Sequence, residues 1–168
     1  MQNSPAKPDP LKPVKRWLKS TSNRTFVLYP ILLAAFEYAW NGGRINVVGW
    51  NVLWGIPLLI WGYGQYRLVG NFRERLGGGG PGLAIPPDRI VDYGPYAYTR
   101  NPMYLGHMIF MLGLAITLWS WAALILLAAH IVWFQRRVLE DEERLTKMFG
   151  EPYKDYHRRV KRWIPYII

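Results

Sequence analysis

Met103–Phe134 is the stretch that most restricts how this chain folds, because its 32 residues contain no Asp, Glu, Lys or Arg. As one unbroken helix it would measure ~48 Å, well beyond the ~30 Å hydrocarbon core of a bilayer. Ser120 lies in the middle of the stretch, between Trp119 and Trp121. We therefore predict a helical hairpin that turns at Ser120, in a chain that resides in a membrane.

Two further apolar runs precede this hairpin, Phe26–Trp40 and Val47–Val69, and Arg67 is the first charged residue in the second of them. The second run also contains glycines that would let another helix approach closely, namely Gly49, Gly55, Gly62 and Gly64. The expected fold is an all-α integral membrane protein with about four transmembrane helices, including the C-terminal hairpin.

The charges are distributed unevenly around these runs. The chain has 21 Lys+Arg against 11 Asp+Glu, a net charge of +10. If the N-terminus is cytoplasmic, only Arg44 of the 21 lies outside, as the positive-inside rule requires. We predict that both termini face the cytoplasm, in a bacterial inner membrane. The net charge then reports topology and does not indicate nucleic-acid binding.

The expected domain organisation is simple. Residues 1–24 form a basic, Pro-rich cytosolic arm that lies on anionic headgroups and is helical only near Val14–Lys19. Residues 25–168 form a single membrane domain. The chain has no Cys, which excludes disulfides, Cys-ligated metal sites and a Cys nucleophile.

Polar segments at the two ends of the hairpin, residues 70–102 and 135–168, should meet on the cytosolic side. Arg100, Asn101 and Tyr104 begin the third run, where helix amides favour a carboxylate or phosphate. Glu140–Glu143 are four successive acids, which form either a solvated helix face or a ligand-binding group. The helix should end at Gly150, and tyrosines at helical spacing after it predict a C-terminal helical cap.

Three polar residues fall inside the apolar runs. Glu37 is either a functional intramembrane acid or an interfacial residue. His107 and His130 lie at a similar depth across the hairpin, where packing is favoured over a role as proton acceptor. Two histidines without a third ligand make a poor metal site, so we predict none.

Two motifs carry a family resemblance. GPYAYTRNPMYLG (residues 94–106) is followed by the acidic cluster, and then by Phe149-Gly150, Tyr153, Tyr156, Val160 and Pro165. Together they resemble the isoprenylcysteine carboxyl methyltransferase superfamily, which includes bacterial membrane methyltransferases and relatives of phospholipid N-methyltransferases. The resemblance covers residues 88–165.

The resemblance implies that S-adenosylmethionine binds in a cytosolic pocket covered by the C-terminal segment, with residues 88–165 as the cofactor-binding part. It places the family's paired acids at Asp141 and Glu142, or at Glu142 and Glu143 after a one-residue slip. Arg137 and Glu142 are the implied catalytic residues. Asn101 stands where the family usually has His, so an ionisable role there is not expected. The expected cofactor contacts, including Arg100 as a carboxylate ligand, are Asp88, Val91, Tyr96, Arg100, Asn101, Pro102, Met103, Tyr104, Asp141 and Glu142.

The implied function is S-adenosylmethionine-dependent methylation of a lipophilic, membrane-embedded acceptor. A lipid amine, an isoprenoid or other lipid carboxylate and a thiol all remain open as acceptors, as does the oligomeric state. Methyl transfer from a sulfonium is a direct displacement that needs neither a metal nor a triad. Two alternatives stand beside it: an NADPH-dependent membrane reductase of a lipid or sterol, and a non-enzymatic membrane scaffold subunit. The expected partners are the bilayer and the acceptor, with no nucleic acid.

Overall fold

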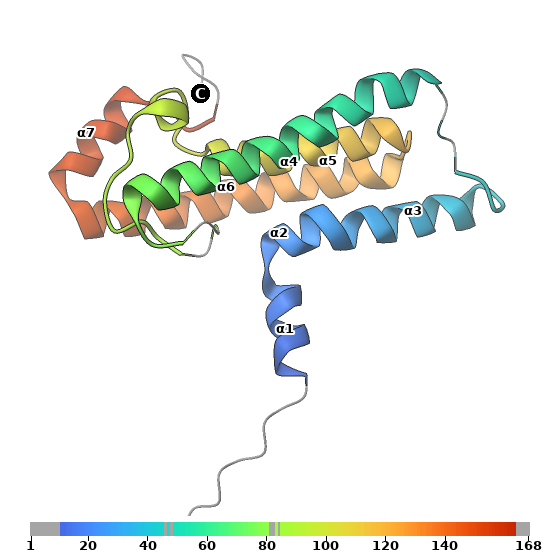
Figure 1. Ribbon diagram of the computed structural model, residues 1–168, viewed down its shortest axis with the longest axis horizontal. Helices are drawn as coiled ribbons and strands as arrows, with labels where there is room; N and C mark the ends of the chain where they lie inside the picture. Colours follow the sequence, from blue (N-terminus) through green and yellow to red (C-terminus); the bar gives the residue numbers. More distant parts are fainter. Residues whose placement is uncertain (1–10, 46, 48, 81–82, 84, 164–168) are drawn as a thin grey trace, which may run out of the picture.

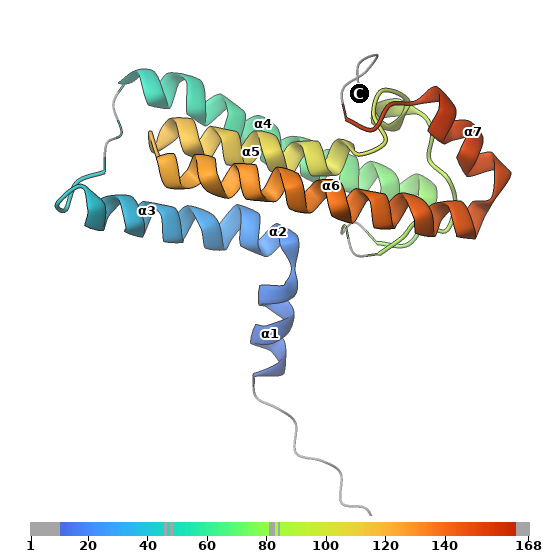
Figure 2. The ribbon, with the colours of Figure 1, turned by 180° about the vertical axis from the view of Figure 1, so that it is seen from behind.

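A computed structural model describes residues 11–45, 47, 49–80, 83 and 85–163. Within these residues the chain is helical and has no strand. Four long helices lie side by side, and the last short helix crosses one end of the bundle (Figures 1 and 2). In chain order the helices are α1 (Lys12–Lys19), α2 (Thr21–Asn23), the π-helix η1 (Arg24–Leu28), α3 (Tyr29–Trp40), α4 (Gly49–Gly77), the 3-10 helix η2 (Gly94–Ala97), α5 (Pro102–Thr117), α6 (Trp121–Phe149) and α7 (Glu151–Arg159).

The predicted hairpin is confirmed. α5 ends at Thr117 and α6 begins at Trp121, with Ser120 as its N-cap. The Ser120 hydroxyl accepts a hydrogen bond from the Ala123 amide at 3.1 Å and donates one to Glu37 at 2.5 Å. Glu37, which is buried, therefore ties α3 to the hairpin turn.

Length and composition single out α6 in the part of the chain that the structure describes. It is the one helix there that is both long and apolar enough to cross a bilayer, and α5 is a shorter apolar helix. α6 extends well past the apolar run that ends at Phe134, so its second half carries the acidic cluster.

Glycines hold α4 and α5 close together. A Cβ added at Gly62 would lie 2.5 Å from the backbone nitrogen of Phe110, and one at Gly55 would lie 2.7 Å from that of Thr117. Gly49 and Gly64 have no neighbour within 4 Å of such a Cβ. The predicted close approach thus depends on two of the four glycines. On α5, Gly106 and Gly113 lie similarly close to the backbone of α4.

His107 lies fully buried in the bundle, in ring contact with Phe26, Tyr66 and Phe134. His130 contacts the same Phe134 ring and bonds the Tyr29 hydroxyl at 3.2 Å. Both histidines therefore pack within the bundle. Among the described residues, no group of three or more His, Cys, Asp or Glu could hold a metal.

α6 ends where the sequence predicts, at Gly150, whose positive φ of 64° favours glycine. α7 then crosses the end of the bundle (Figure 2). It buries Tyr153 and Tyr156 against Val91 and Met103, and the Tyr156 hydroxyl donates to the Tyr96 carbonyl at 2.8 Å. This is the predicted C-terminal cap.

At the N-terminus, α1 leaves the bundle at a steep angle to α3 (Figures 1 and 2). The predicted helix near Val14–Lys19 is confirmed and begins slightly earlier, at Lys12. α2, η1 and α3 follow one another directly from Thr21, so the last residues of the predicted arm join the bundle. Residues 1–10 of the arm lie outside the described residues.

Candidate functional site

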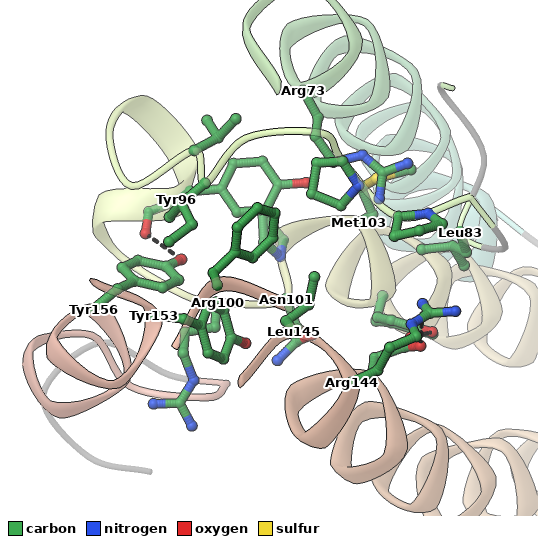
Figure 3. Close-up of a pocket in the computed structure, with 18 of the residues that line it drawn as sticks. Arg73, Leu83, Tyr96, Arg100, Asn101, Met103, Arg144, Leu145, Tyr153 and Tyr156 are labelled. Atoms are coloured by element: carbon green, nitrogen blue, oxygen red, sulfur yellow. Dashed lines mark hydrogen bonds and ion pairs between the residues drawn. The ribbon is translucent and has the colours of Figure 1, made fainter. Parts of the chain in front are cut away.

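A pocket lies where α4, α5, α6 and α7 meet (Figure 3). Including its open mouth, the space inside this pocket measures about 700 Å³. Its wall is mixed, with aliphatic and aromatic side chains around a few charged ones. The lining residues are Arg73, Leu83, Ile85, Pro86, Pro87, Ile90, Val91, Tyr96, Arg100, Asn101, Pro102, Met103, Tyr104, Asp141, Arg144, Leu145, Phe149, Tyr153 and Tyr156.

The structure brings most of the predicted site residues to this pocket, but three of them lie outside its lining. Asp88 is exposed and accepts a hydrogen bond from the Gly79 amide at 3.0 Å. Arg137 lies beside the acidic cluster, 3.8 Å from both Glu140 and Asp141. Glu142 is buried behind the wall. The predicted residues that do line it are Val91, Tyr96, Arg100, Asn101, Pro102, Met103, Tyr104 and Asp141.

The N-terminus of α5 forms one side of the pocket. The helix begins at Pro102, whose fixed φ suits a first helical position. The first-turn amides have no partner inside their own helix, so the lining residues Met103 and Tyr104 place such amides at the pocket. This end of the helix favours an anionic group.

Backbone pairing joins the segment before α5 to the tail after α7. The Arg100 amide donates to the Lys161 carbonyl at 2.9 Å. Thr99 Oγ1 and Asn101 Nδ2 both donate to the Arg162 carbonyl, at 2.9 and 3.2 Å. Asn101 thus acts as a neutral hydrogen-bond donor that holds the cap against the start of α5.

Asp141 is the acid that faces the pocket. Its Oδ2 accepts from the Tyr104 hydroxyl and its Oδ1 from Arg144 Nη2, both at 2.8 Å. Its side chain is only 16% exposed. Asp141 therefore presents a partly buried negative charge beside an aromatic ring at the pocket wall.

Glu142 lies one residue on and faces the cap. Its carboxylate pairs with Arg100 Nη2 at 2.9 Å, with Arg162 Nη2 at 2.8 Å and with His157 Nε2 at 3.4 Å. Burial by itself would raise the pKa of Glu142, but the bonds from Arg162 and Arg100 outweigh it and hold that pKa below its usual value. Glu142 is therefore charged at neutral pH and neutralised by the cap.

Arg100 lines the pocket, but its guanidinium nitrogens donate hydrogen bonds to other residues of the protein. Nε and Nη2 contact Glu142, while Nη1 donates to the carbonyls of His157 at 2.7 Å and Val160 at 2.5 Å. The guanidinium group is thus directed at Glu142 and the cap, and its expected role as a carboxylate ligand stays a prediction. These contacts support the wall.

Two further arginines at the pocket were not predicted from the sequence. Arg73, buried on α4, donates to the carbonyls of Gly80 at 2.5 Å and Ile85 at 3.1 Å and so positions the loop over the pocket. Arg144 pairs with Asp141. Arg144 lies four residues after Glu140 in the charged cluster, a spacing that predicts only an ion pair on the helix surface. For Arg73 the sequence carries no signal, because its partners are backbone carbonyls.

The tyrosines of the pocket are neutral. Burial raises the pKa of Tyr96 to about 12, despite the opposing effect of Arg73. Burial also raises the pKa values of Tyr153 and Tyr156. At neutral pH these side chains therefore offer ring faces and hydroxyls rather than phenolate bases. Figure 3 shows Tyr96, Tyr153 and Tyr156 on the same side of the pocket.

The sequence of the chain is also similar to those of known proteins. The family model for phospholipid methyltransferase matches residues 50–152. The chain belongs to the phospholipid methyltransferase family, which confirms the resemblance read from the sequence.

The isoprenylcysteine methyltransferases among the curated relatives match a little under half of the chain. The protein-S-isoprenylcysteine O-methyltransferase of Schizosaccharomyces pombe is 34% identical over 80 residues, which is 46% of this chain and 34% of that enzyme. The enzyme of the same name in Mus musculus is 35% identical over 80 residues, 46% of this chain and 28% of its own length. The matched part thus spans about a third of these relatives. The steroid 5-alpha-reductase DET2 of Solanum lycopersicum is 27% identical over 148 residues, 85% of this chain and 54% of that protein.

Proposed function

We propose that this protein is an S-adenosylmethionine-dependent methyltransferase that acts on a lipophilic acceptor in the membrane. The observation that carries the proposal is the pocket, which lies within the family-matched residues 50–152 apart from its two cap tyrosines. The named activity of the isoprenylcysteine relatives supports it.

The pocket residues fit the methyl donor. A sulfonium cation is attracted to aromatic ring faces, which Tyr96, Tyr104 and Tyr153 supply. We propose that Asp141 accepts hydrogen bonds from ribose hydroxyls or the amino group, and that the first amides of α5 receive the carboxylate. Residues 88–165 would then form the cofactor-binding part of one membrane domain.

The chemistry asks little of the protein beyond placement. The donor supplies an activated methyl group when it is bound, and the chain must hold the acceptor in line with it while water is excluded. We propose that Arg137, beside Asp141, orients an anionic acceptor. Glu142 is proposed as a positioning residue, which holds Arg100 and the cap. The acceptor is a lipid amine, a lipid carboxylate or a thiol that enters laterally between helices.

We also propose four membrane spans, with η1 and α3 as the first and α4, α5 and α6 as the others. The four lie side by side, which gives them a common axis (Figure 1). Arg44 would then face outside, and the pocket and both termini the cytoplasm, in keeping with the charge distribution.

A nicotinamide-dependent reductase is the second candidate, since the match to the tomato steroid reductase covers 85% of this chain. Isothermal titration of the purified protein in detergent separates the two. We expect binding of S-adenosylmethionine and none of NADPH. The reverse result would replace the methyltransferase by a reductase, and binding of neither would favour a scaffold.

The site itself is tested by Asp141→Asn. Loss of the charge at the pocket wall should weaken S-adenosylmethionine binding at least about tenfold, ~1.4 kcal/mol. Glu143→Gln is the matched control, because this nearby acid on the same helix is exposed and pairs with Lys147. Equal affinities for the two variants would remove Asp141 from the site. Transfer of label from the cofactor into total membrane lipid would then identify the acceptor.

A further inference from the structure

A second cavity lies between the N-terminal helices and α4, next to the pocket described above. We name it the interfacial groove. Including its open side it measures about 1080 Å³. Its walls combine three cations with hydroxyl and aromatic side chains, among them Arg16, Lys19, Arg67, Ser22, Tyr63 and Tyr66.

The charge of the groove has one sign. Arg16 and Lys19 come from α1 and Arg67 from α4, and the lining within the described residues contains no Asp or Glu. All three side chains are exposed. No ion pair joins them to an acid in the described part of the chain, whereas Arg100 and Arg144 at the pocket are both paired. Three convergent cations without a counter-charge suit a phosphate group.

Hydrogen-bond groups lie beside these cations. Ser22 Oγ donates to the Tyr66 hydroxyl at 2.6 Å, which leaves the tyrosine proton for a ligand. The bend that brings α1 over the groove is held by Asn23, whose Nδ2 donates to the Trp17 carbonyl at 3.1 Å. One hydrogen bond therefore joins the two walls of the groove, and a second holds the bend within the N-terminal wall.

Apolar surface around the groove indicates a lipid rather than a free phosphate. Phe26 and Val27 continue its wall toward the apolar part of the bundle. Outside it, α1 exposes Val14, Trp17 and Leu18 next to its cations, and it stands at a steep angle to α3 (Figure 1). A basic amphipathic helix in that orientation lies along a membrane surface.

We propose that the interfacial groove binds the phosphodiester headgroup of an anionic bilayer lipid, with an acyl chain along Phe26 and Val27. The site is separate from methyl transfer, although it shares the membrane placement put forward above. Leu83 lines both cavities, so the lipid site lies next to the pocket.

Native mass spectrometry of the full chain in detergent tests this site, with dioleoylphosphatidylglycerol as the probe. We expect one lipid to be retained about tenfold more tightly than dioleoylphosphatidylcholine. The triple variant R16Q/K19Q/R67Q should lose this preference. The matched control R75Q/R136Q/K161Q removes the same charge from exposed cytosolic positions outside the groove and should keep it.

Three results would overturn the proposal. Equal losses in the two triple variants would mean diffuse attraction, and equal retention of the two lipids would mean no headgroup recognition. Displacement of phosphatidylglycerol by millimolar inorganic phosphate would assign the groove to a free anion. S-adenosylmethionine affinity is measured on the same samples. It should be unchanged in R16Q/K19Q/R67Q, so failure of the lipid site and failure of the methyltransferase proposal are distinguishable.

Discussion

Glu142 joins three segments that are far apart in the sequence. Its carboxylate holds Arg100 from the loop before α5, His157 from α7 and Arg162 from the tail. Removing one partner from a buried ion cluster leaves uncompensated charge, which costs more than the pair itself contributes. At the scale of residues, the stability of the cap therefore depends on this acid, while the pocket presents its neighbour Asp141.

Glu142→Gln should destabilise the cap by roughly 3 kcal/mol, because two buried or half-buried arginines lose their counter-charge. Hydrogen exchange of residues 151–159 measures the effect as earlier exchange of α7. Glu143→Gln is the control, since its pair with Lys147 is exposed and screened by solvent. Equal exchange in both variants would contradict this role.

The same cluster predicts an acid limit. The pKa of Glu142 is lowered in the folded protein, so its stabilisation is complete above the ordinary carboxyl pKa of 4.5 and is lost as pH falls through the lowered value. The protection of α7 against hydrogen exchange, corrected for the intrinsic rate, should stay constant from about pH 7 to about pH 5. At lower pH this protection should decrease. An acid transition that persists unchanged in Glu142→Gln would assign it to another group.

At the scale of elements, the contact between α4 and α5 is set by backbone proximity. Gly62 faces the Phe110 backbone, while Gly64 on the same helix faces open space. Small residues at a helix contact permit this approach, which brings the end of α4, with Arg73, beside the start of α5. The packing of two apolar helices thus builds the wall of the pocket.

Gly62→Ala should destabilise the protein by about 1–3 kcal/mol, because the new methyl group overlaps the backbone of Phe110. Backbone atoms cannot move aside as the end of a flexible side chain can. Gly64→Ala should be neutral or slightly stabilising, since alanine is the better helix former. Thermal unfolding in detergent compares the two. A similar loss for both variants would mean that the close contact does not matter.

At the scale of the whole molecule, the helices α3, α4, α5 and α6 lie side by side, with the charged cap at one end of the bundle and the loop with Arg44 near the other (Figure 1). In the proposed topology, the sequence order assigns 20 of the 21 Lys and Arg to the cap side. α1 lies across this axis, which suits a helix along the cytosolic interface. One orientation in the bilayer accounts for the pocket, the groove and the charge distribution together.

Single-cysteine labelling tests that orientation, since the chain has no native Cys. In right-side-out vesicles, Arg44→Cys should react with a membrane-impermeant maleimide, and Lys161→Cys only after permeabilisation. Both positions are exposed on the protein, so access depends on the membrane. Labelling in the opposite order would invert the topology, and labelling of both would place the two positions on one side.

Local signals explain why much of this protein is predictable from its sequence. The uncharged run with Ser120 at its centre determines the hairpin, and Gly150 determines the end of α6, because both act within one helical turn. The TRNP motif and the acidic cluster likewise indicate that two segments meet. Eight of the residues predicted as cofactor contacts line the pocket, because most of them belong to the segment that leads into the start of α5.

Only the tertiary structure decides which of two adjacent acids faces the pocket. Asp141 and Glu142 differ by about 100° around α6, so their roles depend on how that helix is rotated against α5 and α7. The same holds for Arg100, whose donors turn to the cap, and for Arg73, whose partners are carbonyls of a loop. Sequence pattern specifies which residues are charged or apolar along each helix, but rotation and long-range partners arise from packing the whole bundle.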